Sequence, residues 1–216
     1  MFKRNQIEFA ISRLIEPEAQ ESSSQLKTRI KRLLQTDRAL GCNPRSNDVK
    51  KANYAFFRNA APGSGFEVWF SSYEAFALLL GLQLMHHNWP QSFAVSVLRE
   101  VRKDLEKEHK RILKLDSGIL FNEKAIARTL RPGAAVFDTT EPAFLVIVSH
   151  YGISPDQERA AYACSIHSNL DSGSDWIAQT VKGVGGGSSM FELTVAAHAL
   201  ARELQRTNPR PRGRSA

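Results

Sequence analysis

The spacing of apolar residues predicts a largely helical first half of the chain. Apolar side chains recur at helical intervals between Ile7 and Ile15, which predicts an amphipathic helix over residues 5–16. Ser24 is a favourable N-cap for a second helix, which Gly41 ends. The apolar face of this second helix consists of Leu26, Ile30, Leu33 and Leu34.

Two aromatic runs in the next segment predict a β-hairpin. They cover residues 54–57 and 66–70, and the sequence Ala-Pro-Gly-Ser-Gly between them is a strong turn signal. Ser71 then caps a further helix, because Glu74 three residues later completes a capping box. The sequence Asn-Trp-Pro that finishes at Pro90 ends this helix and begins the next one.

A heptad pattern indicates that residues 91–115 form one long helix that pairs with a second copy of the chain. From Ala94 onward the pattern steps alternately by four and three positions, and Glu108 is its single polar member. The flanks are dense in charged side chains, as in coiled coils: Arg99, Glu100, Arg102, Lys103, Asp104, Glu106, Lys107 and Lys110. The expected dimerisation residues are Leu98, Val101, Leu105, Ile112 and Leu115.

The segment after Pro132 predicts a small sheet with helices. The expected strands are residues 134–137, 144–148 and 162–166. The expected helices are residues 175–182 and 190–206, separated by a glycine-rich loop at 183–189. We therefore expect an α+β protein, with a small sheet-and-helix domain over residues 116–207 and a disordered Arg/Pro tail over residues 208–216.

Composition adds an uneven distribution of charge to this picture. The chain has 216 residues and a formal net charge of +7, and its first 60 residues hold twelve Lys/Arg against six Asp/Glu. This asymmetry favours an anionic partner at the N-terminal end. No apolar run approaches the ~18 residues of a membrane span. Cys42 and Cys164 lie far apart without metal-type or redox-type spacing, so we expect a reduced, cytoplasmic protein with no metal or cofactor.

The basic second helix followed by a hairpin is the arrangement of a DNA-reading head. A helix fits the major groove, its cations meet phosphates, and a hairpin reaches the flanking backbone. The expected DNA-binding residues are Lys27, Arg29, Lys31, Arg32 and Arg38 on the helix, with Lys50, Lys51 and Arg58 near the hairpin. The alternative is that these charges form a solvated surface without a partner.

The order of these elements over residues 5–115 resembles that of the MerR-type winged-helix transcriptional regulators. The segment from Phe66 to Glu74 is similar to their wing strand running into the third helix, and residues 82–94 are similar to the following helix pair. The chain lacks the arginine–tyrosine-rich segment and the metal-sensing cysteines of that family. The resemblance implies a winged helix-turn-helix head over residues 1–90, a dimerisation helix over 91–115, and sequence-specific binding to double-stranded DNA by a bacterial-type regulator.

The tail carries a second DNA signal. Pro211-Arg212-Gly213-Arg214 matches four core residues of an AT-hook, in which arginines such as Arg212 and Arg214 enter a narrow A·T minor groove. The alternative is an Arg/Pro tail that serves solubility alone.

Two other classes of function stay open at this point. The heptad helix and the C-terminal domain could instead form a protein–protein interaction module, and that domain could also bind a small-molecule or protein effector. A small-molecule enzyme would have to use His150, Cys164 and His167, although Cys164 and His167 face opposite sides of an extended strand. The glycine-rich loop lacks the lysine of a phosphate-binding P-loop, which favours a hinge. RNA could also take the place of DNA.

Overall fold

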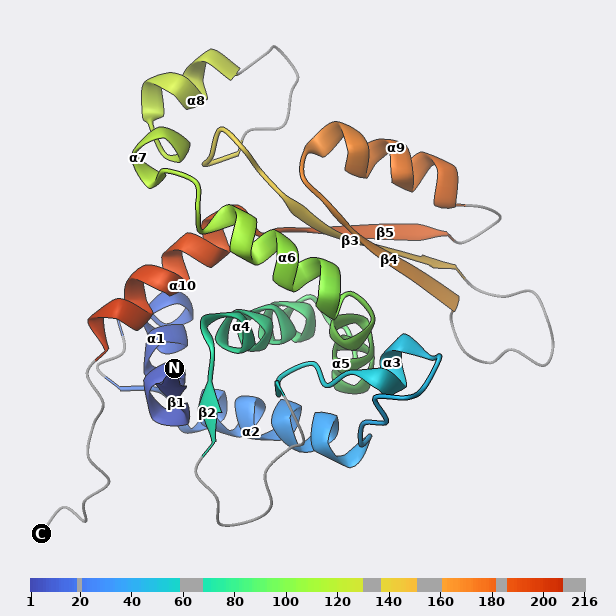
Figure 1. Cartoon of the computed structure of the whole chain (residues 1–216). Helices are drawn as coiled ribbons and strands as arrows, with labels where there is room; N and C mark the ends of the chain where they lie inside the picture. Colours follow the sequence, from blue (N-terminus) through green and yellow to red (C-terminus); the bar gives the residue numbers. More distant parts are fainter. Residues whose placement is uncertain (19–20, 59–67, 130–136, 151–160, 182–185, 208–216) are drawn as a thin grey trace, which may run out of the picture. The chain divides into compact units, whose positions relative to one another are not determined.

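A computed structural model describes residues 1–18, 21–58, 68–129, 137–150, 161–181 and 186–207. Helices and a small number of strands make it a mixed α+β protein, as expected (Figure 1). The chain forms two compact units, which we describe separately. Unit 1 consists of residues 1–102 together with the chain from Ala199 onward, and unit 2 consists of residues 103–198. The boundary therefore falls inside the segment that the heptad pattern predicts to be one helix.

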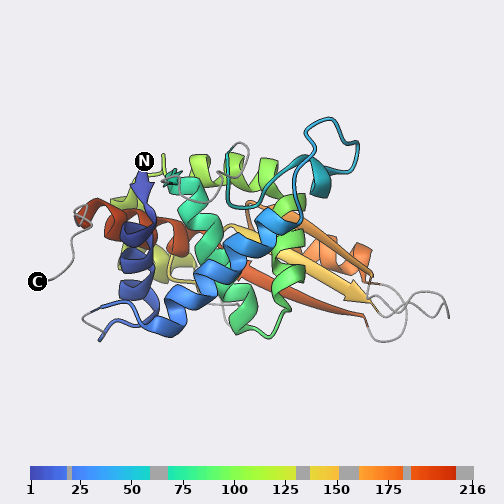
Figure 2. The same cartoon turned by 90° about the horizontal axis from the view of Figure 1, so that it is seen from below.

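Unit 1 is built around the apolar helix α4. Its elements are β1 (Phe2–Lys3), α1 (Arg4–Ile15), α2 (Ser24–Ala39), α3 (Val49–Ala52), β2 (Trp69–Phe70), α4 (Ser72–His86), α5 (Gln91–Glu100) and the end of α10 (Thr194–Arg206). Eleven of the fifteen residues of α4 are buried, and this helix packs against both α2 and α5. In Figure 2 α2 crosses in front of α4 and α5.

The ends of these helices follow the predicted caps closely. The side chain of Ser71 accepts from the backbone N–H of Glu74, whose carboxylate accepts in return from the backbone N–H of Ser71. Ser23, one residue before the predicted Ser24, caps α2 by accepting from the N–H of Leu26. Gly41 adopts a left-handed backbone (φ +64°) just after α2, which a residue without a Cβ does at no steric cost.

Two buried ion pairs hold the helices of unit 1 together. Asp37 of α2 is fully buried and lies 2.6 Å from the guanidinium of Arg99 in α5. Its carboxylate also accepts from the backbone N–H groups of Ala55 and Phe56, so both of its oxygens have partners. In the second pair, Arg102 lies 3.5 Å from Glu74. Arg99 and Arg102 are thus packing residues of unit 1, and their prediction as charged flanks of a coiled coil is wrong.

The predicted hairpin does not form in the residues that the structure describes. Residues 54–58 contain no strand, and the only strand near the second aromatic run is β2. Its partner is the N-terminal strand β1, where Phe2 pairs with Phe70 and Lys3 with Trp69. The aromatic residues Phe56 and Phe57 are instead buried in the core of unit 1, which satisfies the same hydrophobic pattern without a strand.

The predicted single helix over residues 91–115 is also wrong. The helix α5 ends at Glu100, and α6 (Arg102–Ile112) begins after a break at Val101, whose backbone lies outside the helical region at φ −85° and ψ 1°. A continuous coiled-coil helix would need helical torsions throughout. Of the five predicted dimerisation residues, Leu98, Val101, Leu105 and Ile112 are buried in the single chain and Leu115 is half-buried.

Unit 2 contains a three-stranded antiparallel sheet with a helix on one face. Its further elements are α7 (Ser117–Leu120), α8 (Glu123–Thr129), β3 (Phe144–His150), β4 (Ala161–His167), α9 (Leu170–Thr180), β5 (Gly187–Glu192) and the start of α10. The strand order is β4-β3-β5, and α9 connects the two outer strands. Helix α9 packs closely on β3, because a Cβ on Gly173 would lie 3.0 Å from Met190 and 3.5 Å from Val146.

Strands β3 and β4 confirm two of the three predicted strands. Residues 134–136 of the third lie outside the described residues, and Phe137 is not in a strand. Part of the predicted glycine-rich loop at 183–189 is a strand instead. Residues 183–185 lie outside the described residues, whereas Gly187–Glu192 is strand β5, paired along β3 from Ser149 to Phe144. Helix α10 accordingly starts at Thr194 rather than at residue 190. No helix among the described residues has the length and apolar character needed to cross a bilayer.

Candidate functional site

Helix α2 is held in place by polar contacts at both ends. At its start, the carboxylate of Glu16 accepts from the backbone N–H and the hydroxyl of Ser23, at 3.2 and 2.6 Å. Arg4 of α1 donates to the carbonyl of Lys27 at 3.3 Å. Nearer the C-terminal end, the amide of Gln91 donates to the carbonyl of Arg32 and to the hydroxyl of Thr36. The helix therefore presents a fixed outer surface.

The outer surface of α2 carries positive charge alone. The predicted residues Lys27, Arg29, Lys31, Arg32 and Arg38 are all exposed. Among the described residues none of them lies in an ion pair. The only acidic residue of the helix is Asp37, whose charge is buried against Arg99. Five cations thus face solvent without a neutralising carboxylate.

These cations lie along two flanks of α2 rather than in one line. At 100° per residue, Lys27, Lys31 and Arg38 share one side of the helix, and Arg29 and Arg32 share another side roughly 150° away. The buried stripe that includes Ile30 and Leu33 faces the core. Directly opposite that stripe, between the two flanks, lie Thr28 and Gln35, which are both exposed.

A cleft of about 240 Å³ lies beside the first of these flanks. Lys31 and Arg38 line it from α2, and Lys3 and Arg4 line it from the start of α1. The remaining lining residues are Asn5, Leu34, Gln35, Phe57, Val68 and Phe70, so none is acidic.

The cations of the cleft differ in how they are held. Arg4 pairs with Glu8 at 2.7 Å, the ammonium of Lys3 lies 5.1 Å from the ring centre of Trp69, and the guanidinium of Arg38 lies 5.9 Å from that of Phe57. Lys3 and Arg4 were not predicted as binding residues. The signal in the sequence is a pair of cations directly before the predicted helix over residues 5–16, where the helix dipole favours an anion.

The three DNA-binding residues predicted near the hairpin have different surroundings. Lys50 is half-buried and lies 3.2 Å from Glu100, while Lys51 lies 3.9 Å from Asp48. Arg58 is exposed. Residues 54–58 contain no strand, so the described part of the chain shows no wing to which these three residues would belong as predicted. Arg212 and Arg214 of the tail lie outside the described residues.

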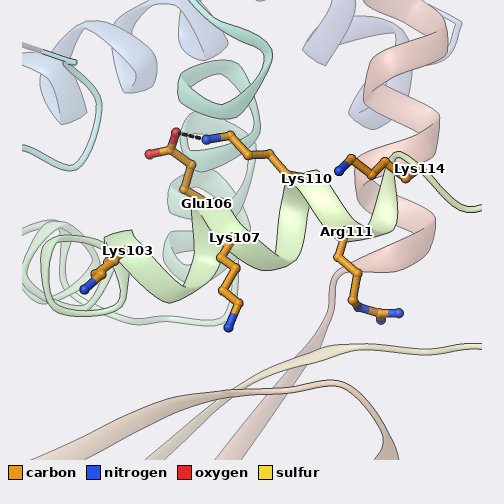
Figure 3. A pocket seen from close by; sticks show the side chains of 6 residues that line it. All are labelled: Lys103, Glu106, Lys107, Lys110, Arg111 and Lys114. Carbon is orange, nitrogen blue, oxygen red and sulfur yellow. Dashed lines mark hydrogen bonds and ion pairs between the residues drawn. The ribbon is translucent and has the colours of Figure 1, made fainter.

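A second cationic surface lies on α6 in unit 2. It borders a shallow hollow of about 560 Å³ lined by Lys103, Glu106, Lys107, Lys110, Arg111 and Lys114 (Figure 3). The four lysines are spaced by four, three and four residues, so they fall on one line along the helix and the turn that continues it. Lys103, Lys107 and Lys110 were predicted as flanks of a coiled coil. The line that they form with Lys114 was not predicted, although the spacing in the sequence alone shows it.

The titratable groups of unit 2 are perturbed mainly by burial. Burial lowers the pKa of His109 to about 4, against the opposing attraction of Glu106. Burial also lowers the pKa of His167 and raises that of Glu192, whose carboxylate accepts from the backbone N–H groups of Thr194 and Val195. In the part of the chain that the structure describes, no group of three or more potential metal ligands comes together.

The residues considered for an enzyme are not gathered at one place. His150 pairs with Ala161 at one end of the β3–β4 ladder, and His167 pairs with Phe144 at the other end. Six residues of extended strand separate these ends, which corresponds to ~20 Å. Cys164 lies between them, opposite Ile147. The backbone therefore keeps the two histidines too far apart to share one reacting centre.

The strongest chemical feature of the described residues is thus cationic surface, on α2 with its cleft and on α6. Comparison of the chain with protein-family models, with curated proteins and with solved structures finds no match.

Proposed function

We propose that unit 1 binds double-stranded DNA through α2. The observation that carries this proposal is the outer surface of the helix, on which five cations are exposed while the only carboxylate, that of Asp37, is buried. Neutralising phosphates with Lys and Arg releases condensed counterions, which is the main source of affinity for DNA. A surface with no internal carboxylate partner keeps its full charge for that purpose.

The two-flank layout supports the major groove as the site of binding. The groove is ≈ 12 Å wide and accepts an α-helix, and a phosphate backbone runs along each of its two sides. The flank of Lys27, Lys31 and Arg38 would face one backbone, and the flank of Arg29 and Arg32 would face the other. The cleft beside the first flank offers additional cations to the same backbone.

The exposed midline between the flanks would then face the base edges. Gln35 can make a bidentate contact to the N6 and N7 atoms of adenine, and hydroxyl groups such as that of Thr28 contact either kind of base pair. The hydroxyl of Thr28 donates to the carbonyl of Ser24 in the described structure, so it would accept from a base. Base contacts of this kind give sequence specificity, whereas phosphate contacts give position and affinity.

Transcriptional regulation is the simplest role for a protein that reads bases through a helix. A relationship to the MerR-type regulators and the formation of a homodimer remain part of the proposal. Two of the elements that suggested the family differ, since the described parts of residues 54–70 form no hairpin and the predicted pairing helix breaks at Val101. The proposal therefore rests on α2 rather than on a wing or a coiled coil.

The test compares two variants of equal net charge. One carries glutamine at Lys27, Arg29, Lys31, Arg32 and Arg38. The control carries glutamine at five exposed cations elsewhere, namely Arg13, Arg45, Lys124, Arg128 and Arg202. Binding to a duplex is measured over a range of salt concentrations.

We expect the α2 variant to lose about 4 to 5 units of the log–log salt slope, at ~0.9 for each phosphate contact, and the control to keep the wild-type slope. Equal losses in both variants would mean that net charge alone attracts DNA. If the wild-type protein does not bind a DNA duplex at low salt, the proposal is refuted. If it binds duplex RNA more strongly than duplex DNA, RNA is the partner instead of DNA.

A further inference from the structure

The lysine line on α6, which consists of the four lysines that border the hollow, destabilises the isolated helix through repulsion between like charges. Lys103 and Lys107, Lys107 and Lys110, and Lys110 and Lys114 are neighbours at spacings of three or four residues, and like charges at these spacings destabilise a helix. All four lysines are exposed. A helix selected only for solubility would place carboxylates at some of these positions, because opposite charges at the same spacings stabilise it.

Among the described residues only one lysine of this line, Lys110, is paired with a carboxylate. Glu106 pairs with Lys110 at 2.7 Å, and Figure 3 shows the two side chains meeting above the helix axis. Glu108 pairs with Arg111 at 2.9 Å, and Glu141 reaches the same guanidinium at 3.4 Å. Within the described residues Lys103, Lys107 and Lys114 have no carboxylate partner. Three positive charges on one line are therefore available to an external anion.

We propose that this line is a second nucleic-acid-binding surface, which contacts the phosphate backbone of one DNA strand through Lys103, Lys107, Lys110 and Lys114. Lys103 and Lys114 are eleven residues apart, which corresponds to roughly 16 Å along a helix. Five steps from one phosphate to the next along one strand cover a similar length of a duplex, about 17 Å at ~3.4 Å a step. The inference takes its class of partner from the proposed function, but it shares no residue with α2.

The packing of α6 favours a nucleic acid over a lipid surface. Helices that bind membranes through a basic face also insert an apolar face into the bilayer. The apolar residues of α6, Leu105 and Ile112, are buried, so this helix presents only charge. A partner that is recognised by charge along a line, without an apolar contact, fits a phosphate backbone.

The first experiment removes two lysines of the line in the full chain. The variant is Lys103→Gln with Lys107→Gln, and the matched control is Lys124→Gln with Arg128→Gln on α8 of the same unit. The binding constant for a duplex is measured at 50 and 200 mM salt, in the wild-type background and in the background of the five α2 substitutions. Vesicles containing phosphatidylserine form a second arm.

The quantity compared is the ratio of Kd at 200 mM salt to Kd at 50 mM salt. Each lost phosphate contact should lower this ratio by about 3.5-fold, so we expect the ratio to fall about twelvefold in the α6 variant and to stay unchanged in the control. The change should appear in both backgrounds. An effect of the α2 substitutions with no effect of the α6 pair would overturn this inference and leave the proposed function in place. An effect of the α6 pair with no effect of the α2 substitutions would refute the proposed function and leave this inference in place. Salt-sensitive binding of the α6 line to vesicles but not to DNA would also overturn the inference.

A single charge reversal separates a binding role from a solvated surface. Lys107→Glu places a carboxylate within reach of Lys103, Lys110 and Arg111, so it should raise the midpoint of thermal unfolding by about 2–4 °C. A binding surface predicts that the same variant loses more DNA affinity than Lys124→Glu does. Greater stability with the same affinity as Lys124→Glu would show that the line is only solvated charge.

Discussion

The two cationic helices, α2 and α6, both expose lysine and arginine, but they differ in how a buried titratable side chain is accommodated. On α2 this side chain is Asp37, which pairs with the guanidinium of Arg99 at 2.6 Å. On α6 it is His109, which is neutral near pH 7 because burial lowers its pKa to about 4. A buried acid can be accommodated by an ion pair, whereas burial itself favours the neutral form of a histidine.

The outward faces of the two helices differ as well. The cations of α2 lie on two flanks around a polar midline, and the lysines of α6 lie on one line. Two flanks match the two backbones of a groove and leave room for base contacts between them. One line matches one backbone and leaves nothing to read bases. Exposed positive charge can therefore serve sequence reading on one helix and simple attachment on the other.

The largest expected effect is the loss of the buried pair. Asp37→Ala leaves the guanidinium of Arg99 buried without its partner and two backbone N–H groups without an acceptor, which should lower the free energy of unfolding by about 3–5 kcal/mol. Urea unfolding measures this value, and Asp48→Ala, at an exposed carboxylate, is the control. A loss no larger than that of the control would show that Asp37 is not needed to hold α2 on α5.

The neutral histidine predicts a specific dependence of stability on pH. The pKa of His109 is near 6.5 in the unfolded chain and about 4 in the folded one, so the unfolded state binds the proton more readily. The contribution of the neutral His109 side chain to the free energy of unfolding is fully present above pH 6.5 and is lost as the pH falls toward 4. The full difference corresponds to roughly 3 kcal/mol.

Thermal unfolding of wild type and of His109→Gln, measured from pH 7.5 to pH 4, tests this dependence. The wild-type midpoint should fall more steeply than that of the variant between pH 6.5 and pH 4. Parallel curves would contradict a buried, neutral His109.

A smaller effect is expected at the midline of α2. Gln35→Ala should reduce discrimination between a preferred duplex and a changed one by about 1–3 kcal/mol, because it removes one side chain that can pair bidentately with adenine. The salt slope should not change, since no phosphate contact is lost. Gln25→Ala, which lies on a flank, is the control. Equal discrimination by all three proteins would place base reading elsewhere.

Sequence periodicity predicted the elements whose signals are local. Helices α2 and α4 were found because apolar spacing, a capping serine and a terminating glycine or proline lie within one stretch of chain. The capping box of Ser71 and Glu74 was predicted in full. The exposed cations of α2 were also predicted, because the apolar stripe left them no other face.

The elements that were missed depend on distant partners. Strand β2 pairs with β1, almost seventy residues earlier in the chain, and β5 is a strand because β3 pairs with it despite its glycine and serine content. The break at Val101 does not show in a heptad count, because Arg99 and Arg102 look like surface charges until Asp37 and Glu74 are placed beside them. Burial of charge by a remote partner is not visible in local periodicity.

The most direct test of the central claim is the salt dependence of duplex binding for the two flanks of α2 taken separately. One variant carries Lys27→Gln, Lys31→Gln and Arg38→Gln, and the other carries Arg29→Gln and Arg32→Gln. If α2 contacts both phosphate backbones at once, the log–log salt slope should fall by about 2.7 in the first variant and by about 1.8 in the second. The two losses should add in the combined variant. An unchanged slope in either variant would contradict a helix that lies between two backbones.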